Sequence, residues 1–253
     1  MGGTRLCRRR LPDLRPEGPA HRRDHHRDRR DAGRYRETGI ERSVRSQWRG
    51  ENHDHAVPAL PLLGRASGGV RERRLTVVRL LALSGSLRSD SSNTTLLHAF
   101  SENAPEGITV KIFEGLGDLP LFSPDKEAET PDSVLRLAAA VEVCDGILIS
   151  CPEYAHGIPG AFKNALDWLG SRFEIPGKPA MLVHASTRNV YLREHLREVL
   201  RTISCRLYPE PEFEVHLIRK DRPEIDAILS TGEMRAAMRM KLEGFERFAA
   251  QEG

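Results

Sequence analysis

Short apolar runs alternate with helical patterns over about 175 residues, from Leu75 to the end of the chain. An apolar run of four to eight residues between turn residues predicts a buried strand, and apolar residues spaced three and four apart predict an amphipathic helix. The predicted strands cover 77–83, 109–113, 146–151 and 180–185, with a weaker one at 212–217. The predicted helices cover 92–102, 132–144, 160–170, 191–203 and 233–251. This alternation predicts an α/β fold with one parallel sheet covered by helices on both faces.

Five strands in a doubly wound parallel sheet most often take the flavodoxin-like order 2-1-3-4-5. The run Ile147-Leu148-Ile149-Ser150 has no polar alternation, which suits a central strand. In this order the topological switch point lies between the first and third strands, and ligands bind beyond their carboxyl ends. We therefore expect the loops that follow these two strands to form a binding site.

The loop after the first strand, residues 84–93, reads Ser-Gly-Ser-Leu-Arg-Ser-Asp-Ser-Ser-Asn. Its hydroxyls, amide and guanidinium precede a helix N-terminus with unpaired backbone N–H groups, which is typical of a phosphate-binding turn. Ser and Asn are also ordinary helix N-caps, so the loop alone equally allows a structural role. The chain has neither G-x-x-x-x-G-K-[ST] nor G-x-G-x-x-G, so hydroxyls, Arg88 and backbone amides would hold the anion. That set fits a mononucleotide phosphate better than a triphosphate with magnesium.

The loop after the third strand, residues 152–160, has the composition to receive a flat heteroaromatic ring. Tyr154 offers an aromatic face, Gly157 lets backbone approach closely, and Pro159 stiffens the entry to the next helix. Backbone N–H groups of residues 154–157 could bond the polar edge of such a ring. The alternative is a plain turn and helix start with Tyr154 as a packing residue. His156 alone is weak evidence of an acid or base.

The first 75 residues have a different composition from the rest. They contain 19 Arg, no Lys and 10 Asp or Glu, a net charge of about +9, which leaves about −6 for the remainder. Because this segment lacks apolar periodicity, we expect a disordered extension over 1–75 and a folded domain over 76–253. Arg without Lys also suggests GC-biased coding and a start codon placed too far upstream. A flexible tail and a nucleic-acid-binding arm are alternatives, the second disfavoured by the interspersed acids and the lack of spaced aromatics.

The sequence predicts a reduced, cytoplasmic protein. No apolar run approaches the roughly 20 residues that a membrane helix needs, and the first residues lack the apolar core of a signal peptide. The four cysteines have no C-x-x-C spacing, and the histidines of the extension lack cysteine partners of the kind that bind zinc. We therefore expect no metal site and no membrane partner.

Two motifs resemble the NADPH-dependent FMN reductase family, flavodoxin-like flavoproteins that include quinone, azo-dye and chromate reductases. Gly85-Ser86-Leu87-Arg88, with Ser91 and Asn93, is similar to the family's G-S-x-R-x-x-S-x-N phosphate loop. Residues 152–168 are similar to its P-E-Y-N-x-x-x-P-G-x-x-K-N-A-x-D-W block. The resemblance runs from about Val78 to the C-terminus and leaves the first 75 or so residues uncovered.

The resemblance implies a set of cofactor-binding residues. Those at the FMN phosphate are Ser86, Arg88, Ser91 and Asn93, and those along the isoalloxazine are Pro152, Glu153 and Tyr154 with the backbone of Ala155, His156 and Gly157. Lys163, Asn164 and Trp168 would shape the following helix and a subunit contact. Family members are usually homodimers or homotetramers, with the flavin near the interface.

The implied activity is transfer of electrons from NADPH or NADH through FMN to quinone-like or other small acceptors. Flavin accepts hydride from the nicotinamide, so the protein need supply only position, exclusion of water and hydrogen bonds. We expect no catalytic side chain, because Cys151, Glu153 and His156 each have a structural explanation as a buried small residue, helix-start acid or loop filler.

Two positions depart from the family's pattern. Ala155 stands where the family usually has Asn, which removes a side-chain hydrogen bond. After the fourth strand the family generally has a glycine-rich loop that closes on the pyrimidine side of the flavin, whereas residues 185–197 contain no glycine. Either Ser186 or Thr187 supplies the missing contacts, or flavin affinity is reduced. If flavin affinity is reduced, the alternative function is that of a flavin-binding flavodoxin-like module without turnover.

Overall fold

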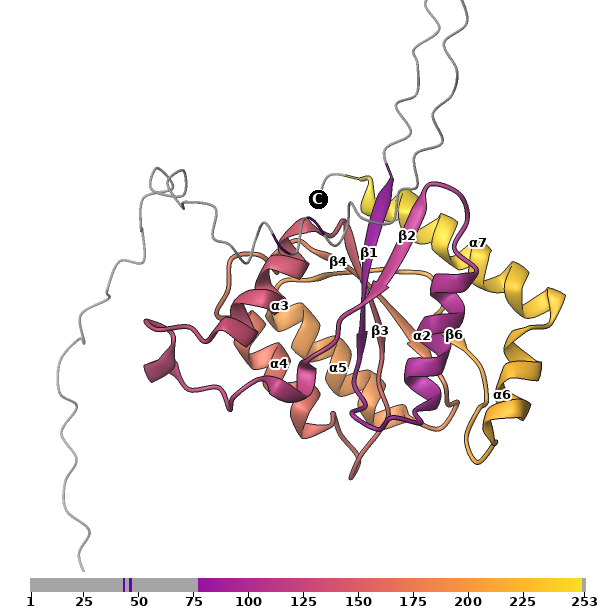
Figure 1. Cartoon of the computed structure of the whole chain (residues 1–253), viewed down its shortest axis with the longest axis horizontal. Coiled ribbons are helices and arrows are strands. Elements are labelled where there is room, and N and C mark those ends of the chain that lie inside the picture. The colour runs from indigo at the N-terminus through magenta and orange to yellow at the C-terminus, as the bar shows by residue number, and fades with distance from the viewer. Residues whose placement is uncertain (1–42, 44–45, 47–76, 252–253) are drawn as a thin grey trace, which may run out of the picture. The chain divides into compact units, whose positions relative to one another are not determined.

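The computed structural model describes Ser43, Ser46 and residues 77–251 of the 253-residue chain (Figure 1). Apart from those two serines, the predicted extension over 1–75 lies outside the described residues, as does the boundary at 75/76. Among the described helices, none combines the length and apolar character needed to cross a membrane.

A parallel sheet forms the centre of the domain. Its strands are β1 (Val78–Ser84), β2 (Ile108–Ile112), β3 (Gly146–Ser150), β4 (Pro179–His184), β5 (Arg206–Leu207) and β6 (Phe213–Glu214). They follow the order β2-β1-β3-β4-β5, and β6 also pairs with β4. The predicted flavodoxin-like order 2-1-3-4-5 is therefore confirmed, with a sixth strand added.

The edge of the sheet next to β4 is split into two short strands, β5 and β6. Ala180 near the start of β4 pairs with Leu207, and Val183 near its end pairs with Phe213. Between these strands lie Pro209 and Pro211, which have no backbone N–H to donate to a strand ladder. The single edge strand predicted at 212–217 is therefore only partly right: β6 occupies Phe213–Glu214 within it, and β5 was not predicted.

Six α-helices and two short 3-10 helices surround the sheet within the described residues. The α-helices are α2 (Ser92–Glu102), α3 (Asp132–Val143), α4 (Gly160–Gly170), α5 (Val190–Thr202), α6 (Arg222–Leu229) and α7 (Gly232–Ala249), and the 3-10 helices are η1 (Leu116–Asp118) and η2 (Pro124–Lys126). The five predicted helices occur within two residues of their expected ends. Helix α6 was not predicted, although Asp221 and Glu224 form a capping box at its start, a pattern visible in the sequence.

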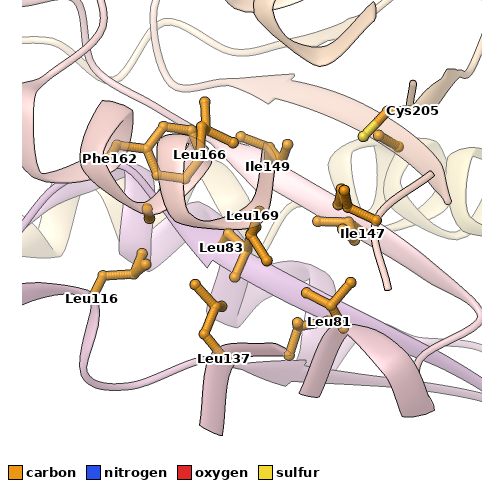
Figure 2. Packing of buried hydrophobic residues seen from close by; sticks show 14 of the residues in the cluster. Leu81, Leu83, Leu116, Leu137, Ile147, Ile149, Phe162, Leu166, Leu169 and Cys205 are labelled. Atoms are coloured by element: carbon orange, nitrogen blue, oxygen red, sulfur yellow. The ribbon is translucent and has the colours of Figure 1, made fainter. Parts of the chain in front are cut away.

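The helices form a layer on each face of the sheet (Figure 1). Leu81, Leu83 and Ile149 pack with residues of α3, α4 and α5, as Figure 2 shows for Leu137, Phe162 and Leu166. Leu80, Ala82 and Leu148 point to the other face and pack with residues of α2, α6 and α7. Fully burying one such leucine contributes roughly 1.5–3 kcal/mol. Since both faces are buried, the strands read as continuous apolar runs rather than as alternating ones.

Asn164 and Trp168 of α4 hold the segment that follows η1. The Asn164 side chain accepts from the N–H of Phe122 at 2.8 Å and donates to the carbonyl of Pro120 at 3.0 Å. The indole N–H of Trp168 donates to the same carbonyl at 2.7 Å. These contacts give both residues a structural role inside the domain, while the expected shaping of the helix and the expected subunit contact stay predictions.

Candidate functional site

A cavity of about 540 Å³ opens at the carboxyl ends of the strands. Its walls come from the loops that follow β1, β3, β4 and β6, together with the starts of α2 and α6. Because β1 and β3 are neighbours, the cavity lies at the switch point of the sheet, where open α/β sheets bind ligands.

Most of the residues expected at the site line this cavity. Seven of the ten do so, namely Ser86, Arg88, Ser91, Asn93, Pro152, Glu153 and Tyr154. Ala155, His156 and Gly157 do not line it. Tyr154 is about half exposed, so its ring lies at the mouth rather than deep inside.

Two further walls complete the cavity; the sequence pointed to the first, through Ser186 or Thr187, but not to the second. Residues 185, 186, 188 and 189 come from the loop after β4, and residues 217–220 with Ile225 come from the loop after β6 and from α6. The second wall was missed because the split edge strand and α6 were not recognised. Asp90 and Ser92 of the first loop complete the lining.

The phosphate loop presents hydrogen-bond donors to the cavity. Ser91 is the N-cap of α2, and its hydroxyl oxygen accepts from the N–H of Thr94 at 3.4 Å. The Ser86 hydroxyl oxygen accepts from the N–H of Arg88 at 3.3 Å, which leaves its own O–H to donate. The Asn93 amide oxygen accepts from the Ser150 hydroxyl at 3.0 Å, so its NH₂ group is the part left for a ligand. Ser86, Ser91 and Asn93 are buried and line the cavity, so their donors lie in its wall.

Gly85 is required by the close contact of this loop with β3. Its N–H donates to the carbonyl of Ser150 at 2.8 Å. A Cβ at this position would lie 2.2 Å from the sulfur of Cys151 and 2.9 Å from its Cβ. Only a residue without a side chain lets the turn pass over the end of β3. Burial raises the pKa of the Cys151 thiol well above its usual range, which keeps it protonated and unreactive.

Positive charge predominates around the cavity. Arg88, Arg188, Arg219 and Lys220 line it, against the carboxylates of Asp90 and Glu153. An excess of cationic side chains around a cavity favours an anionic ligand.

The loop after β3 forms a tight hairpin turn. Tyr154 and Gly157 pair through both backbone hydrogen bonds, at 3.1 and 3.0 Å. The two residues between them, Ala155 and His156, have φ of 48° and 59°, the left-handed values of a type I′ turn. Asn and Gly are the residues that favour this conformation. Replacement of the family's usual Asn by Ala155 therefore costs backbone strain as well as the side-chain hydrogen bond that was expected to be lost.

Glu153 joins this loop to the start of α5. One carboxylate oxygen accepts from the N–H of Leu192 at 3.0 Å, and the other lies 3.3 Å from Nδ1 of His156. The His156 ring in turn packs edge-on against Tyr191, with 4.6 Å between centroids. Asn189, the N-cap of α5, gives no side-chain cap, so Glu153 supplies the acceptor that its first turn lacks. Glu153 is thus a helix-start acid, but of α5 rather than of the helix that follows it in sequence.

Comparison with known proteins identifies the family. The family model described as NADPH-dependent FMN reductase matches residues 78–219, more than half of the chain. The chain belongs to the NADPH-dependent FMN reductase family. It is therefore an oxidoreductase, with FMN as cofactor and a nicotinamide nucleotide as electron donor.

Relatives with similar sequences carry names of the same kind. The chain is 32% identical over 170 residues to the quinone reductase of Escherichia coli K12, an alignment that covers 64% of this chain and 88% of that protein. It is 33% identical over 156 residues to the 2-hydroxy-1,4-benzoquinone reductase of a Burkholderia species, covering 59% and 83%.

Among solved structures, the chain is similar to the flavoenzyme NAD(P)H:(acceptor) oxidoreductase FerB from Paracoccus denitrificans. The TM-score is 0.56 and the sequence identity 25%, with 68% of this chain and 98% of that chain covered. This NADPH-dependent FMN reductase family member therefore shares its fold with a flavoenzyme of known structure.

The residues of the cavity fit FMN. Three buried polar side chains and a helix N-terminus supply donors for a phosphate dianion, and Gly85 leaves the backbone of the loop close to the sheet. The surrounding excess of cationic side chains suits the charge of that group.

Gly85→Ala is expected to lower the free energy of unfolding by about 1–3 kcal/mol, because the added methyl group overpacks against Cys151. Urea unfolding measures this loss. Gly160→Ala is the matched control, since a Cβ at position 160 meets no atom within 4 Å. Cys151→Ala in the Gly85→Ala background should restore part of the stability, because the sulfur is removed while the Cβ at 2.9 Å remains. Equal stability of Gly85→Ala and the wild type would disprove this account of the turn.

Ala155→Asn is expected to raise the free energy of unfolding by about 1 kcal/mol, since Asn tolerates the left-handed backbone better than Ala. Thermal unfolding of the two proteins measures the difference. Ala236→Asn, at an exposed position inside α7, should instead lower stability, because Asn is a poorer helix former than Ala. If both substitutions change stability by the same amount and sign, the turn is not strained.

Proposed function

We propose that this protein carries electrons from NADPH or NADH through FMN to small quinone-like acceptors. The observation that carries the proposal is the convergence of Ser86, Ser91 and Asn93, all buried, on one wall of a cavity at the switch point. These donors, with Arg88 beside them, match what a single phosphate group requires.

Each residue of the phosphate loop has a distinct part in the proposed complex. Ser86 and Asn93 donate through the O–H and N–H groups that their other hydrogen bonds leave available. Ser91 lies at the N-terminus of α2, whose backbone N–H groups and dipole favour negative charge. Arg88 is exposed and lines the cavity, so its guanidinium is positioned to close over a phosphate from the solvent side.

The ring of the cofactor would lie between the loops after β3 and β4. Pro152, Glu153 and Tyr154 line one side, with the backbone of residues 155–157 beyond them, and Ser186 and Arg188 line the other. FMN supplies the redox chemistry when bound, since it accepts hydride from a nicotinamide and passes electrons to a second substrate. The half-exposed Tyr154 leaves the mouth open, which suits two substrates that bind in turn.

No side chain is proposed as a catalytic residue. Glu153 is engaged by the N–H of Leu192, and Cys151 is a buried thiol whose pKa is raised by desolvation. The chain contributes position, exclusion of water and hydrogen bonds to the cofactor.

Quinones are proposed as acceptors because the relatives from Escherichia coli and the Burkholderia species are named as reductases of quinones. We further propose a cytoplasmic homodimer or homotetramer. Val190 and Tyr191 are more than half exposed, and Tyr191 packs on His156 next to the mouth of the cavity. Such an apolar surface beside the site suits contact with a second subunit.

The second candidate function is a flavin-binding module without turnover. The observation that favours it is the loop after β4, where residues 185–189 contain no glycine and contribute Arg188 to the cavity instead. The two candidates differ only in whether a nicotinamide nucleotide reduces the bound flavin.

The visible spectrum of the purified protein tests both candidates. We expect a yellow protein that is bleached by NADPH or NADH under argon and recoloured by a quinone. A yellow protein that neither nucleotide bleaches would select the module without turnover. A colourless protein that does not bind added FMN would rule out both.

Arg88→Ala is expected to weaken FMN binding roughly 10- to 150-fold. A hydrogen bond to a charged group typically contributes about 1.5–3 kcal/mol, which corresponds to this change in the dissociation constant. Quenching of flavin fluorescence on binding measures the dissociation constant. Arg136→Ala is the matched control, since Arg136 is exposed on α3 and does not line the cavity. Unchanged affinity in Arg88→Ala would remove this residue from the site.

A further inference from the structure

The loop between β4 and α5 is held by a chain of buried polar side chains. His184 ends β4 and is 1% exposed, and Asn189 precedes α5 and is 3% exposed. Their side chains join at 2.9 Å between Nδ1 of His184 and Nδ2 of Asn189. The residues that flank the segment 185–188 are therefore tied to each other.

Arg193 fixes the direction of the hydrogen bonds that join Asn189, His184 and Glu212. Its Nε donates to the amide oxygen of Asn189 at 2.9 Å, so the NH₂ group of Asn189 must face His184. Nδ1 of His184 then accepts and carries no proton. The proton of the neutral imidazole lies on Nε2, which donates to a carboxylate oxygen of Glu212 at 2.7 Å.

Glu212 ends this series of hydrogen-bonded side chains. Burial alone would raise the pKa of Glu212, but the hydrogen bond from His184 and the charge and hydrogen bond of Arg197 together lower it below its usual value. Arg197 donates to the other carboxylate oxygen at 2.8 Å from Nε, and Arg193 lies 3.7 Å away on the His184 side. The carboxylate stays ionised and is held on both sides.

Arg193 also contacts the middle of the loop. Arg193 Nη2 donates to the carbonyl of Ser186 at 3.1 Å, and the Ser186 hydroxyl accepts from the N–H of Arg188 at 3.0 Å. Arg193 also pairs with Glu214 of β6, which fixes its guanidinium against the sheet. Ser186, Arg188 and Asn189 all line the cavity. The wall of the cavity on this side is thus held by Arg193 at Ser186 and Asn189, and by His184 at Asn189.

We propose that His184 is a positioning residue for the flavin site, because it holds Asn189 and thereby the segment 185–189 against the cavity. The proposal rests on the proposed function in that the ligand is FMN. A chain of hydrogen-bonded polar side chains fixes one loop conformation where a flexible glycine-rich sequence would otherwise close on the ligand. His184 itself does not line the cavity, so it acts through the loop.

Two substitutions test the hydrogen bonds of the two imidazole nitrogens separately. In His184→Asn the amide oxygen is bonded to Cγ, as Nδ1 is, so it can still accept from Asn189. In His184→Gln the amide nitrogen reaches the place of Nε2, so it can still donate to Glu212 but leaves Asn189 without its acceptor. Glu212 keeps Arg197 in both variants. A role in global stability alone would make the two variants equivalent for FMN binding.

The test measures the FMN dissociation constant and, without FMN, the hydrogen exchange of amides 186–189. We expect His184→Gln to raise the dissociation constant roughly tenfold or more and to speed exchange, because a buried donor loses its partner. His184→Asn should stay within about threefold of the wild type in both measurements. Equal values for the two variants would overturn the proposal.

A variant on the helix keeps the proposal testable if changes at position 184 prevent folding. Arg193→Met removes the donors to Asn189 and Ser186 while leaving His184 and Glu212 in place. Faster exchange of amides 186–189 and weaker FMN binding are expected, whereas Arg201→Met, at an exposed position of α5, should change neither. Unchanged exchange in Arg193→Met would contradict the proposal. Failure of the wild type to bind FMN would instead refute the proposed function, while the exchange measurement would still decide the role of the loop contacts.

Discussion

The pairing of β1 with β3 at Ser84 and Ser150 is the constraint on which the site depends. It brings the carboxyl ends of both strands to one point of the sheet, so the two loops that leave them share a cavity. Ser150 then serves both sides, since its carbonyl accepts from Gly85 and its hydroxyl donates to Asn93. Cys151 follows directly and leaves no room for a side chain at position 85. The phosphate loop is thus shaped by the strand beside it as much as by its own sequence.

Charge and burial divide the cavity into two regions. Hydroxyl and amide groups form its inner wall, while Arg88 lies at an exposed position where the guanidinium remains hydrated until a ligand arrives. The loops after β4 and β6 add three further cations without adding a carboxylate to the lining. An anion that enters therefore exchanges water for donors that the fold already holds in place, and hydrogen bonds to a charged group are stronger than those between neutral groups.

The parts of the fold that depend on local pattern could be predicted from the sequence. The run that forms β1, the N-cap Ser91 and the helix that follows all occur where their hydrophobic periodicity and capping residues indicate. The split edge strand was missed because Pro209 and Pro211 interrupt a weak pattern that only pairing with β4 makes regular. Helix α6 is short and buries only Ile225 and Leu229, so its periodicity is faint.

The contacts that complete the site join residues far apart in the chain, and no local pattern carries them. Glu153 caps a helix that begins 37 residues later, and nothing in the dipeptide Ala155-His156 indicates a left-handed turn. One consequence of the Glu153 contact concerns motion. Since the carboxylate joins the loop after β3 to the first turn of α5, the two walls that flank the mouth are mechanically coupled. The packing of His156 on Tyr191 is a second link between the same two walls, so a displacement of one wall strains the contacts that hold the other.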